Sequence, residues 1–504
     1  MPQTNGRTVA PGRLTNGAAS AVTAELQQIS AEALADPALI DPAFLDAIRM
    51  SRRRQRLART LLPVPAPSGR ARTTWVGDLQ QGDGGKGAMT DRLARVHHAV
   101  VRVQGGDNAG HTTVFTDTQG NDVVVKNHVI PSGLRQPTTI GIIGNGMLIN
   151  AQRLADELQA LSPVMADLSD RVFVSDRAHL ILPLHRVVDA TQEDAKELTG
   201  RAVGTTRRGI GPANVSKVNR IGIRVGDLSD WSVVTSRVTD NITFFGLGAE
   251  HIDVNLSWLA DHTKMLLDRA VDSIRLIDDL VSSGYSVLFE GAQGPLIDLE
   301  RGIYPYVTTS PTAIHSVASG GGFDISRIDH RIGVLKVYQT MVGNGAFVSE
   351  DHADVGQQLR LKGEEFGTTT GRSRRCGWLD LLQARWAVDV NHFTSVVLTK
   401  LDVLDTFERI GVCVAYELDG RIIAEFEPDH DQLCRCRPVY RYFDGWLSST
   451  RHVATYDALP DRAREFVDFI ADHLGVEVGA VTKGPRDSDM LVRLGSDLAR
   501  AHEP

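Results

Sequence analysis

From Arg72 onward, short apolar runs rich in β-branched residues alternate with longer stretches in which apolar residues recur at helical spacing. Strands alternating with helices are typical of an α/β protein with a mostly parallel sheet. We therefore expect a large central sheet with helices on both faces and ligands in the loops at the carboxyl ends of the strands. The predicted strands are residues 73–76, 98–103, 172–174, 286–289, 332–338 and 395–398, and the predicted helices are residues 151–161, 264–283, 378–390 and 461–474.

The first 72 residues differ from the rest of the chain. Residues 1–24 are rich in small and polar residues without periodicity, which predicts disorder, and they contain no apolar signal-peptide core. Residues 30–62 show helical patterning that includes the arginine-rich stretch 51–56, for which a solvated helix end is favoured over a nucleic-acid contact. Prolines and a glycine in residues 63–69 indicate a linker. We expect an N-terminal extension over residues 1–72 and one folded domain over residues 73–504.

The composition narrows the class of protein. The 504 residues are 42% hydrophobic and 23% charged, as in soluble globular proteins. A formal net charge of −8 argues against general nucleic-acid binding. Four cysteines are too few for a disulfide framework and fit a reducing compartment, so we expect a cytoplasmic protein. Cys434 and Cys436 form a lone Cys-x-Cys, which argues against a zinc site because no second pair accompanies it.

A glycine-rich turn that carries a lysine follows the first predicted strand, with the sequence Gly82-Asp83-Gly84-Gly85-Lys86-Gly87. Its glycines let backbone N–H groups approach phosphate oxygens, and Lys86 adds a positive charge. A helix beginning near Ala88 would point its positive end at the same anion. The turn is not a Walker A loop, because it is shorter and no Ser or Thr follows the lysine, so Asp83 is the candidate for binding magnesium. An ordinary glycine-rich connection is the alternative.

Three further loops at strand ends carry polar chemistry. Residues 104–112 bring His111, which could act as a general acid because imidazole titrates near neutral pH. The alternative for His111 is a surface loop histidine. Residues 204–212 combine hydroxyls with arginines, as suits a nucleotide monophosphate. Gln293 follows another strand with an amide that can read a base edge.

Two loops in the C-terminal half complete the set. Residues 367–375 place three threonines beside three arginines, which could bind a small dicarboxylate and close over it through the flanking glycines. A solvated arginine loop is the alternative. Lys400 and Asp402 follow a predicted strand. The Asp402 carboxylate could accept from guanine N1 and N2, and the aliphatic stem of Lys400 could cover a purine face.

Taken in order, these loops resemble the adenylosuccinate synthetase family over about residues 73–495. The matching strings are Gly82-Asp83-x-Gly85-Lys86-Gly87, Gln104-Gly105-Gly106-x-Asn108-Ala109-Gly110-His111-Thr112, Gly204-Thr205-Thr206-x-Arg208-Gly209-Ile210-Gly211-Pro212-Ala213, Phe289-Glu290-Gly291-Ala292-Gln293-Gly294, Tyr304-Pro305-Tyr306-Val307-Thr308, Thr369-Thr370-Gly371-Arg372 and Thr399-Lys400-Leu401-Asp402-Val403-Leu404-Asp405. Several of these strings are long and distinctive of the family, and only the N-terminal extension lies outside the resemblance.

The resemblance implies a reaction in two steps. The family transfers the γ-phosphoryl group of GTP to O6 of IMP, and the amine of aspartate then displaces phosphate at C6. Asp83 matches the base that removes the N1 proton, and Asp83 and the carbonyl of Gly110 match the Mg²⁺ ligands. His111 matches the general acid that stabilises the moving phosphoryl group, and Gln293 matches an amide that assists at the base. Lys86 belongs to the phosphate cradle and completes the expected catalytic set.

The resemblance also implies three sets of binding residues. Those matching the GTP and phosphate contacts are Gly82, Gly85, Gly87, Thr112, Lys400, Asp402, Thr482, Gly484 and Pro485. Those matching the IMP contacts are Asn108, Thr206, Arg220, Thr308, Val342 and Arg372, with Arg220 reaching in from the second subunit of a homodimer. Those matching the aspartate contacts are Thr369, Thr370, Arg372 and Arg374. We expect Mg²⁺ as cofactor, GTP as co-substrate, and neither nucleic-acid nor membrane partners.

The chain departs from the family pattern close to the expected site. The departures are Gly84 for glutamate, Gln81 for tryptophan, Ala88 for lysine, Asp107 for histidine, Arg207 for glycine, Met341 for arginine, and Pro311 and Ile314-His315 in place of an Asn-Thr-Thr-Ala-Gly-Gly pattern. They leave open a paralogue that uses dGMP, GMP or another amine donor, and a non-catalytic nucleotide-binding protein. In the phage branch of the superfamily, which acts on dGMP, a smaller residue generally replaces the catalytic aspartate. Asp83 is retained here, which favours IMP.

Overall fold

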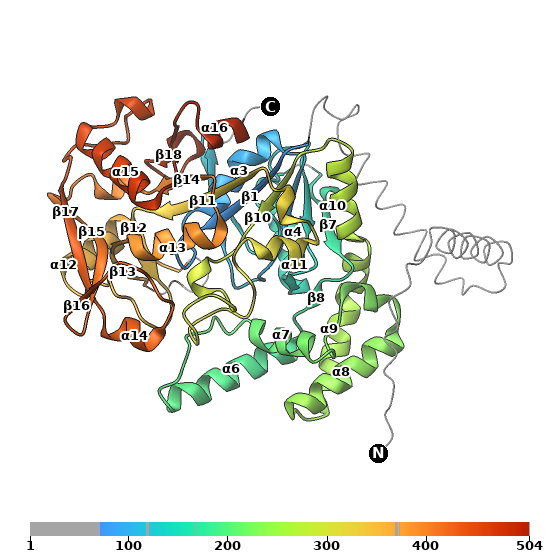
Figure 1. Cartoon of the computed structure of the whole chain (residues 1–504). Helices are drawn as coiled ribbons and strands as arrows, with labels where there is room; N and C mark the ends of the chain where they lie inside the picture. The colour runs from blue at the N-terminus through green and yellow to red at the C-terminus, as the bar shows by residue number, and fades with distance from the viewer. Residues whose placement is uncertain (1–70, 117–119, 166, 368–370, 372, 503–504) are drawn as a thin grey trace, which may run out of the picture. The chain divides into compact units, whose positions relative to one another are not determined.

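The centre of the protein is a ten-stranded sheet (Figure 1). The computed structural model describes residues 71–116, 120–165, 167–367, 371 and 373–502. Neighbouring strands of the sheet are parallel, except that β18 and β19 are antiparallel. This confirms the predicted α/β class with a mostly parallel sheet. In spatial order the strands are β19 (Met490–Val492), β18 (Val478–Thr482), β14 (Ser395–Thr399), β11 (His330–Lys336), β1 (Thr73–Asp78), β10 (Val287–Glu290), β2 (Ala99–Arg102), β5 (Ile140–Ile143), β7 (Val172–Ser175) and β9 (Ala270–Val271).

Strand β1 lies in the middle of this sheet, and all six of its residues are buried. Layers of side chains cover both of its faces, as on the face where Trp75 stacks on Phe393 with ring centroids 5.3 Å apart. The strands that carry the candidate loops, β14, β1, β10 and β2, all lie within this central part of the sheet. Since the carboxyl ends of parallel strands share one edge, the topology alone gathers these loops.

A second sheet packs beside the first and is seen at the left in Figure 1. Its strands are β12 (Tyr338–Met341), β13 (Arg375–Asp380), β15 (Arg409–Leu418), β16 (Arg421–Ile423) and β17 (Arg437–Asp444). Two pairs complete the strands: the hairpin β3 (His111–Thr116) with β4 (Asp122–Asn127), and the parallel pair β6 (Leu148–Ile149) with β8 (His179–Leu180). Buried residues of both large sheets form one continuous apolar core.

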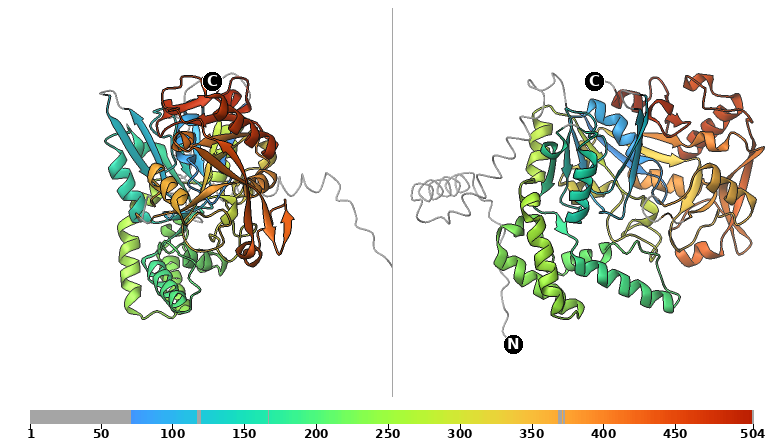
Figure 2. Two further views of the ribbon diagram at one scale, coloured as in Figure 1. Left: turned by 90° about the vertical axis from the view of Figure 1, so that its left-hand side faces the viewer. Right: turned by 180° about the vertical axis from the view of Figure 1, so that it is seen from behind.

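The α-helices cover the main sheet and form a helical lobe below it in the view of Figure 1, shown in green in both views of Figure 2. The lobe contains α6 (Pro183–Leu198), α7 (Ile210–Val218), α8 (Trp231–Phe245) and α9 (Glu250–Leu267). The others are α3 (Lys86–Leu93), α4 (Ala151–Leu161), α5 (Leu168–Arg171), α10 (Ser273–Ser282), α11 (His315–Gly321), α12 (Asp354–Lys362), α13 (Leu381–Asn391), α14 (His430–Arg435), α15 (Asp461–Leu474) and α16 (Asp497–Ala501). Throughout the described ranges, every helix is too short or too polar to span a bilayer.

Two predicted helices have the predicted bounds, and two were wrong in part. Helices α4 and α15 match, and Gly475 ends α15 with a φ of 65°. The predicted helix 264–283 is instead the end of α9, the short strand β9 and the separate helix α10, because Asp272 caps a new N-terminus by accepting from Arg275 N at 3.1 Å. The predicted helix 378–390 begins only at Leu381, because its first three residues belong to β13.

The strand predictions differ in detail. Strand β11 ends at Lys336, and Tyr338 already belongs to β12 of the second sheet. The loop expected to carry His111 ends at that residue, which is the first of β3. The hairpin of β3 and β4 was not predicted. Helix α3 begins at Lys86 rather than near Ala88, because Gly85 takes the left-handed N-cap conformation with a φ of 104°.

Candidate active site

The glycine-rich turn is organised around the carboxylate of Asp78, the last residue of β1. Asp78 Oδ1 accepts from Gln80 N at 2.9 Å, and Oδ2 accepts from Gly84 N at 3.0 Å. Lys86 Nζ bonds the same Oδ2 at 2.8 Å, with the lysine side chain 3% exposed. The turn therefore holds its lysine by an internal ion pair, which leaves further N–H donors of the ammonium for an anion.

The same carboxylate explains the glycine at position 84. A Cβ placed there would lie 2.6 Å from Asp78 Oδ2 and 3.0 Å from a methyl of Val334. The usual glutamate of the family would therefore collide with Asp78. This chain therefore has an aspartate carboxylate, that of Asp78, beside the position where the family usually has a glutamate.

We expect Gly84→Ala to destabilise the protein by about 1–3 kcal/mol, because the new methyl overlaps the Asp78 carboxylate that holds the turn together. Equilibrium unfolding in denaturant measures the change. Gly211→Ala is the matched control, since a Cβ there meets only Thr309 Cγ2 at 4.0 Å. An equal effect of the two substitutions would contradict the steric explanation.

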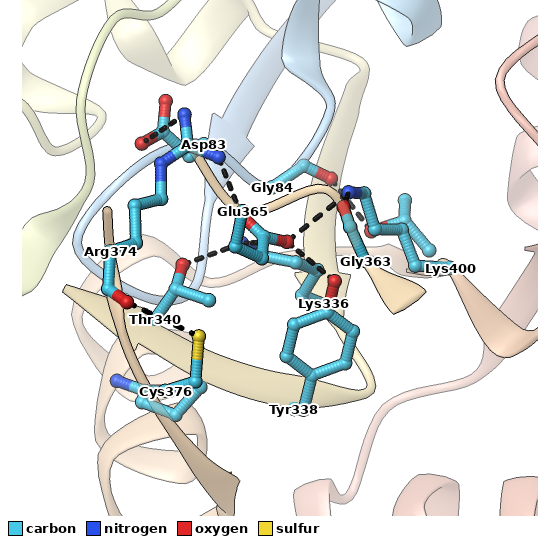
Figure 3. Close-up of polar contacts among 12 residues, drawn as sticks. Asp83, Gly84, Lys336, Tyr338, Thr340, Gly363, Glu365, Arg374, Cys376 and Lys400 are labelled. Carbon is cyan, nitrogen blue, oxygen red and sulfur yellow. Dashed lines mark hydrogen bonds and ion pairs between the residues drawn. The ribbon is translucent and has the colours of Figure 1, made fainter. Parts of the chain in front are cut away.

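Asp83 stands at the tip of the turn in the left-handed conformation, with a φ of 60°. Its side chain is 35% exposed, and Oδ2 lies 3.0 Å from Arg374 Nη2. The opposite side of the Arg374 guanidinium bonds Glu365 Oε2 at 2.5 Å (Figure 3). An unfavourable φ at an accessible carboxylate is a form of backbone strain that is common at functional sites.

His111 lies behind the turn and is held by Glu290, the last residue of β10. His111 Nδ1 is 2.6 Å from Glu290 Oε1, and both side chains are buried. Burial opposes the ionised form of Glu290, but His111, Arg102 and the Ser132 N–H outweigh it and lower the pKa to about 2. Burial lowers the pKa of His111. The pair is thus an ionised carboxylate that accepts from the Nδ1–H of a neutral ring.

Gln293 links the loops that carry Asp83 and His111. A Cβ on Gly82 would lie 3.1 Å from Gln293 Cα, and one on Gly105 would lie 3.4 Å from Gln293 Oε1. Gln293 has a φ of 55°, and both of its amide atoms are buried without a hydrogen-bond partner in the described residues. A buried amide with no partner costs free energy, so this amide is suited to a ligand that would satisfy it.

A buried carboxylate, Glu365, joins the turn to the second half of the site (Figure 3). It is fully buried, and four donors surround its two oxygens. Burial opposes its ionised form, but the charges of Lys336, Lys400 and Arg374 outweigh that effect and hold its pKa well below the usual range. The donors are Lys336 Nζ at 3.0 Å, Lys400 Nζ at 3.2 Å, Tyr338 Oη at 2.5 Å and Arg374 Nη1 at 2.5 Å.

The candidate guanine pocket lies at the ends of β14 and β18. Lys400 N donates to Thr482 Oγ1 at 3.0 Å, and Thr399 Oγ1 donates to the Gly84 carbonyl at 2.8 Å. The pocket is therefore bonded directly to the phosphate turn. Asp402 is 11% exposed, and burial raises its pKa. Gly484, which precedes Pro485, packs against Asp489, because a Cβ on Gly484 would lie 2.4 Å from Asp489 Oδ2.

The candidate IMP residues are brought together in part. Asn108 Oδ1 is buried without a partner in the described residues, and Thr308 is half-buried. The loop that carries Thr206 contacts the loop that carries Val342. The contact is a hydrogen bond in which Asn344 N, of the second loop, donates to the Val203 carbonyl, of the first, at 3.4 Å. Arg220 lies apart from them. It is exposed, has a φ of 66°, and its guanidinium has no ion pair within the described ranges.

The candidate aspartate loop is described only in part. Thr369, Thr370 and Arg372 lie outside the described residues. Arg374 is described and is bonded to Glu365 and Asp83, as given above. It is the candidate residue that links the amino-acid site to the expected base.

The candidate magnesium ligands can be tested for fit. Asp83 offers an accessible carboxylate, and Gly110 is half-buried just before His111. The described residues contain no group of three or more His, Cys, Asp or Glu side chains that could form a metal cage. Magnesium commonly uses one or two protein oxygens and completes its shell with phosphate oxygens and water, so this donor set fits it.

Thr112, a candidate phosphate contact near the start of β3, is exposed and lies opposite Lys126 in the pairing of β3 with β4.

Sequence reasoning missed three carboxylates that position this site: Asp78, Glu290 and Glu365. The first two are polar residues at the last positions of buried strands, which is a signal that could have identified them. Glu365 lies in a loop, and only the fold brings its four donors to it.

Two departures from the family pattern have local explanations. Arg207 has a φ of 55°, in the left-handed region that favours glycine. Its guanidinium bonds Asp194 at 2.7 Å and Glu197 at 3.1 Å, both on α6. Met341 is buried, and Arg375 reaches its sulfur at 3.4 Å, so a guanidinium still occupies the space beside it.

Comparison with known proteins shows the family of the chain. The family model described as adenylosuccinate synthetase matches residues 76–491. Adenylosuccinate synthetase of Chlorobium limicola is 41% identical over 433 residues, which cover 84% of this chain and 98% of that protein. The Moorella thermoacetica protein of the same name is 40% identical over 422 residues, covering 82% of this chain and 97% of that protein.

Solved structures give the same result for the fold. The structure of fully ligated adenylosuccinate synthetase from Plasmodium falciparum has a TM-score of 0.79 and 33% identity, and the match covers 84% of this chain and 100% of that chain. The succinoaminodeoxyadenylate synthetase of cyanophage S-2L, bound to dGMP and dATP, has a TM-score of 0.54 and 21% identity over 84% of this chain and 96% of that chain. At that identity the phage structure supports the fold alone.

Proposed function

The chain belongs to the adenylosuccinate synthetase family, and we propose that it performs the reaction of that family with the residues described above. The reaction joins the amine of L-aspartate to C6 of IMP and uses GTP, giving adenylosuccinate for AMP synthesis. One observation carries the assignment of residues: loops from the neighbouring strands β1, β10 and β2 bring Asp83, Gln293 and His111 together around a glycine-rich turn.

The first step would use Asp83 and His111. Asp83 removes the N1 proton of IMP, O6 attacks the γ-phosphorus of GTP, and GDP leaves. The Nδ1–H of His111 is bound to Glu290, so Nε2 can donate to a phosphoryl oxygen only when the ring is protonated. Phosphate charge beside the ring favours that form, and ionised Glu290 stabilises it. Gln293 supplies its unpartnered amide to the purine.

The second step would use Arg374. Its guanidinium binds a carboxylate of L-aspartate and directs the amine to C6, and phosphate leaves with the former O6 as the new C–N bond forms. Mg²⁺ held by Asp83 and Gly110 would neutralise charge on the transferring phosphates. Asp402 would accept from guanine, which makes GTP the preferred donor.

The remaining assignments extend the proposal. We assign residues 73–504 to the catalytic domain and residues 1–72 to an extension, since relatives matched over nearly their whole length cover 84% of this chain. An exposed Arg220 whose guanidinium forms no ion pair with the residues that the structure describes fits a homodimer in which it completes the partner's site. Four cysteines without disulfides in the described residues fit a cytoplasmic location.

A phosphate-release assay with product mass analysis tests the function. We expect turnover with GTP, IMP, L-aspartate and Mg²⁺ together, and a succinyl-adenylate product. The same assay substitutes ATP for GTP, and GMP, dGMP or XMP for IMP. Turnover with only another nucleotide or amine donor would replace the proposed substrate, and no turnover with any combination would favour a nucleotide-binding protein.

Glu290→Gln should lower kcat by about 10- to 100-fold, the usual effect of losing a group that orients a functional histidine. Glutamine still accepts the Nδ1–H bond but no longer stabilises the protonated ring, so the loss should be greater at the alkaline end of the profile. The pH dependence of kcat measures this. A uniform loss at every pH would contradict the charge argument.

Asp402→Asn should lower kcat/KM for GTP at least tenfold and reduce the preference for GTP over ATP, because the amide no longer offers two acceptor oxygens to guanine. Parallel kinetics with both nucleotides measure the ratio. Asp431→Asn, at a position whose side chain is 99% exposed, is the control and should leave the ratio unchanged. A strict preference for GTP in the Asp402 variant would place base recognition elsewhere.

A further inference from the structure

A cavity of about 270 Å³ lies outside the residues assigned to the substrates. Three arginines, Arg153, Arg186 and Arg208, line it together with Asn150 and Trp258. The arginines come from three separate segments of the chain. None of the residues assigned above to GTP, IMP or aspartate lines the cavity, but Arg208 belongs to the loop 204–212 whose hydroxyls and arginines the sequence suggested for a nucleotide monophosphate.

The local fold places two helix N-termini at this cavity. Strands β6 and β8 are parallel neighbours, and Ile181 N donates to the Ile149 carbonyl at 2.9 Å just beyond them. Each strand leads directly into a helix. Asn150 caps α4 by accepting from Arg153 N at 3.2 Å, and α6 begins at Pro183. The positive ends of both helix dipoles therefore lie at the carboxyl ends of two parallel strands, an arrangement that favours anions. On α6 the Leu184 N–H is already bonded to Asn255 Oδ1 at 3.2 Å, so this helix contributes through its dipole.

Arg208 reaches the same place from a third segment. Its neighbour Gly209 caps α7 and lies against α6, so that a Cβ on Gly209 would be 3.0 Å from Arg186 N. Gly209 N also bonds Asp189 Oδ2 at 2.8 Å on α6. Packing of α7 on α6 thus sets Arg208 beside Arg186.

Two of the arginines keep their guanidinium donors free within the part of the chain that the structure describes, although the buried Asp107 carboxylate interacts electrostatically with both of them, Arg186 and Arg208. Arg186 and Arg208 form no ion pair or side-chain hydrogen bond with any described residue. Arg153 is shared between Glu157 at 3.3 Å and the ring of His128 at 2.7 Å. Asp156 also lines the cavity, but its carboxylate accepts from Gln152 at 2.8 Å. Guanidinium groups whose N–H donors are not bonded to a carboxylate, as in Arg186 and Arg208, suit an anion with several oxygens.

We propose that this cavity is a second phosphate-binding site, which takes inorganic phosphate or a small phosphate monoester. The volume admits a ligand of that size. Asn150 Nδ2 bonds the buried Asp107 at 2.9 Å, next to the candidate IMP residue Asn108, and Arg208 follows Thr206 by two positions. The site shares a wall with the proposed nucleotide site but uses different side chains, and it does not depend on the ligase activity.

Calorimetric titration of inorganic phosphate and of ribose 5-phosphate tests the proposal. The full-length protein is first saturated with IMP and a non-hydrolysable GTP analogue, so that the proposed substrate sites are filled. We expect remaining phosphate binding, at least tenfold weaker in Arg186→Ala because one charged hydrogen-bonding group is lost. Arg201→Ala, which removes an exposed arginine outside the cavity, is the matched control and should bind as the wild type does.

Fluorescence supplies a second readout. Phosphate should change the emission of the wild type, and Trp258→Phe should abolish that change. Whichever of inorganic phosphate and ribose 5-phosphate binds more tightly shows whether the site takes free phosphate or a phosphate monoester. Binding of neither probe, or equal binding by wild type and Arg186→Ala, would overturn the proposal. If phosphate binds as expected but no substrate combination gives turnover, only the proposed function fails.

Discussion

Replacing Asp83 by asparagine is expected to lower kcat about 10²- to 10⁴-fold, the usual contribution of a positioned general base. Asparagine has nearly the same shape and can keep the left-handed conformation that Asp83 adopts. It cannot take the N1 proton of IMP, and it is a poor ligand for Mg²⁺. Without that proton transfer O6 is a weak nucleophile, so the phosphoryl step should fail while substrate binding persists.

A matched control separates this effect from loss of structure. Asp419 also has a positive φ, of 50°, and its carboxylate also pairs with an arginine, Arg435, at 2.7 Å. Asp419→Asn therefore makes the same chemical change in a similar setting away from the site. Steady-state assays and thermal unfolding of both variants measure the outcome. Near-normal turnover in the Asp83 variant would show that another group is the base.

The architecture and the loops of the site could be predicted because they depend on local sequence. Buried parallel strands have nearly continuous apolar sequences, and in such a sheet the polar residues after them must lie at one edge. That reasoning correctly placed Asp83 and Gln293 at strand ends. Helix α4 was predicted with its full bounds from its apolar spacing, and in the structure Asn150 caps the predicted N-terminus.

What could not be predicted depends on contacts between distant segments. Residues 264–283 have a continuous helical pattern, and the pairing of β9 with β7, a distant segment, interrupts it in addition to the Asp272 cap of α10. The sequence shows Gly84 only as a departure from the family pattern, and the structure explains it by the Asp78 carboxylate beside it. Glu365 has no sequence signal, because its donors come from β11, β12, the loop before β13 and the loop after β14.

Glu365→Gln should destabilise the protein by about 3–5 kcal/mol, the usual cost of removing one partner from buried ion pairs. Lys336 is 1% exposed, and the substitution would leave its ammonium with Thr340 but without a counter-charge. Arg374 would keep Asp83 as its carboxylate partner. Because the pKa of Glu365 is lowered on folding, its stabilisation is complete above its unfolded pKa, near 4.5, and is lost as the pH falls below it.

The Glu365 variant should also raise KM for two substrates at once. The same carboxylate holds Lys400, proposed for guanine, and Arg374, proposed for aspartate. Denaturant unfolding and kinetics at low temperature, where the variant stays folded, measure the two effects separately. Glu364→Gln is the matched control, because the neighbouring glutamate is exposed and should change stability by less than about 0.5 kcal/mol. A rise in KM for only one substrate would show that the two binding regions are positioned independently, and unchanged values for both would limit Glu365 to a structural role.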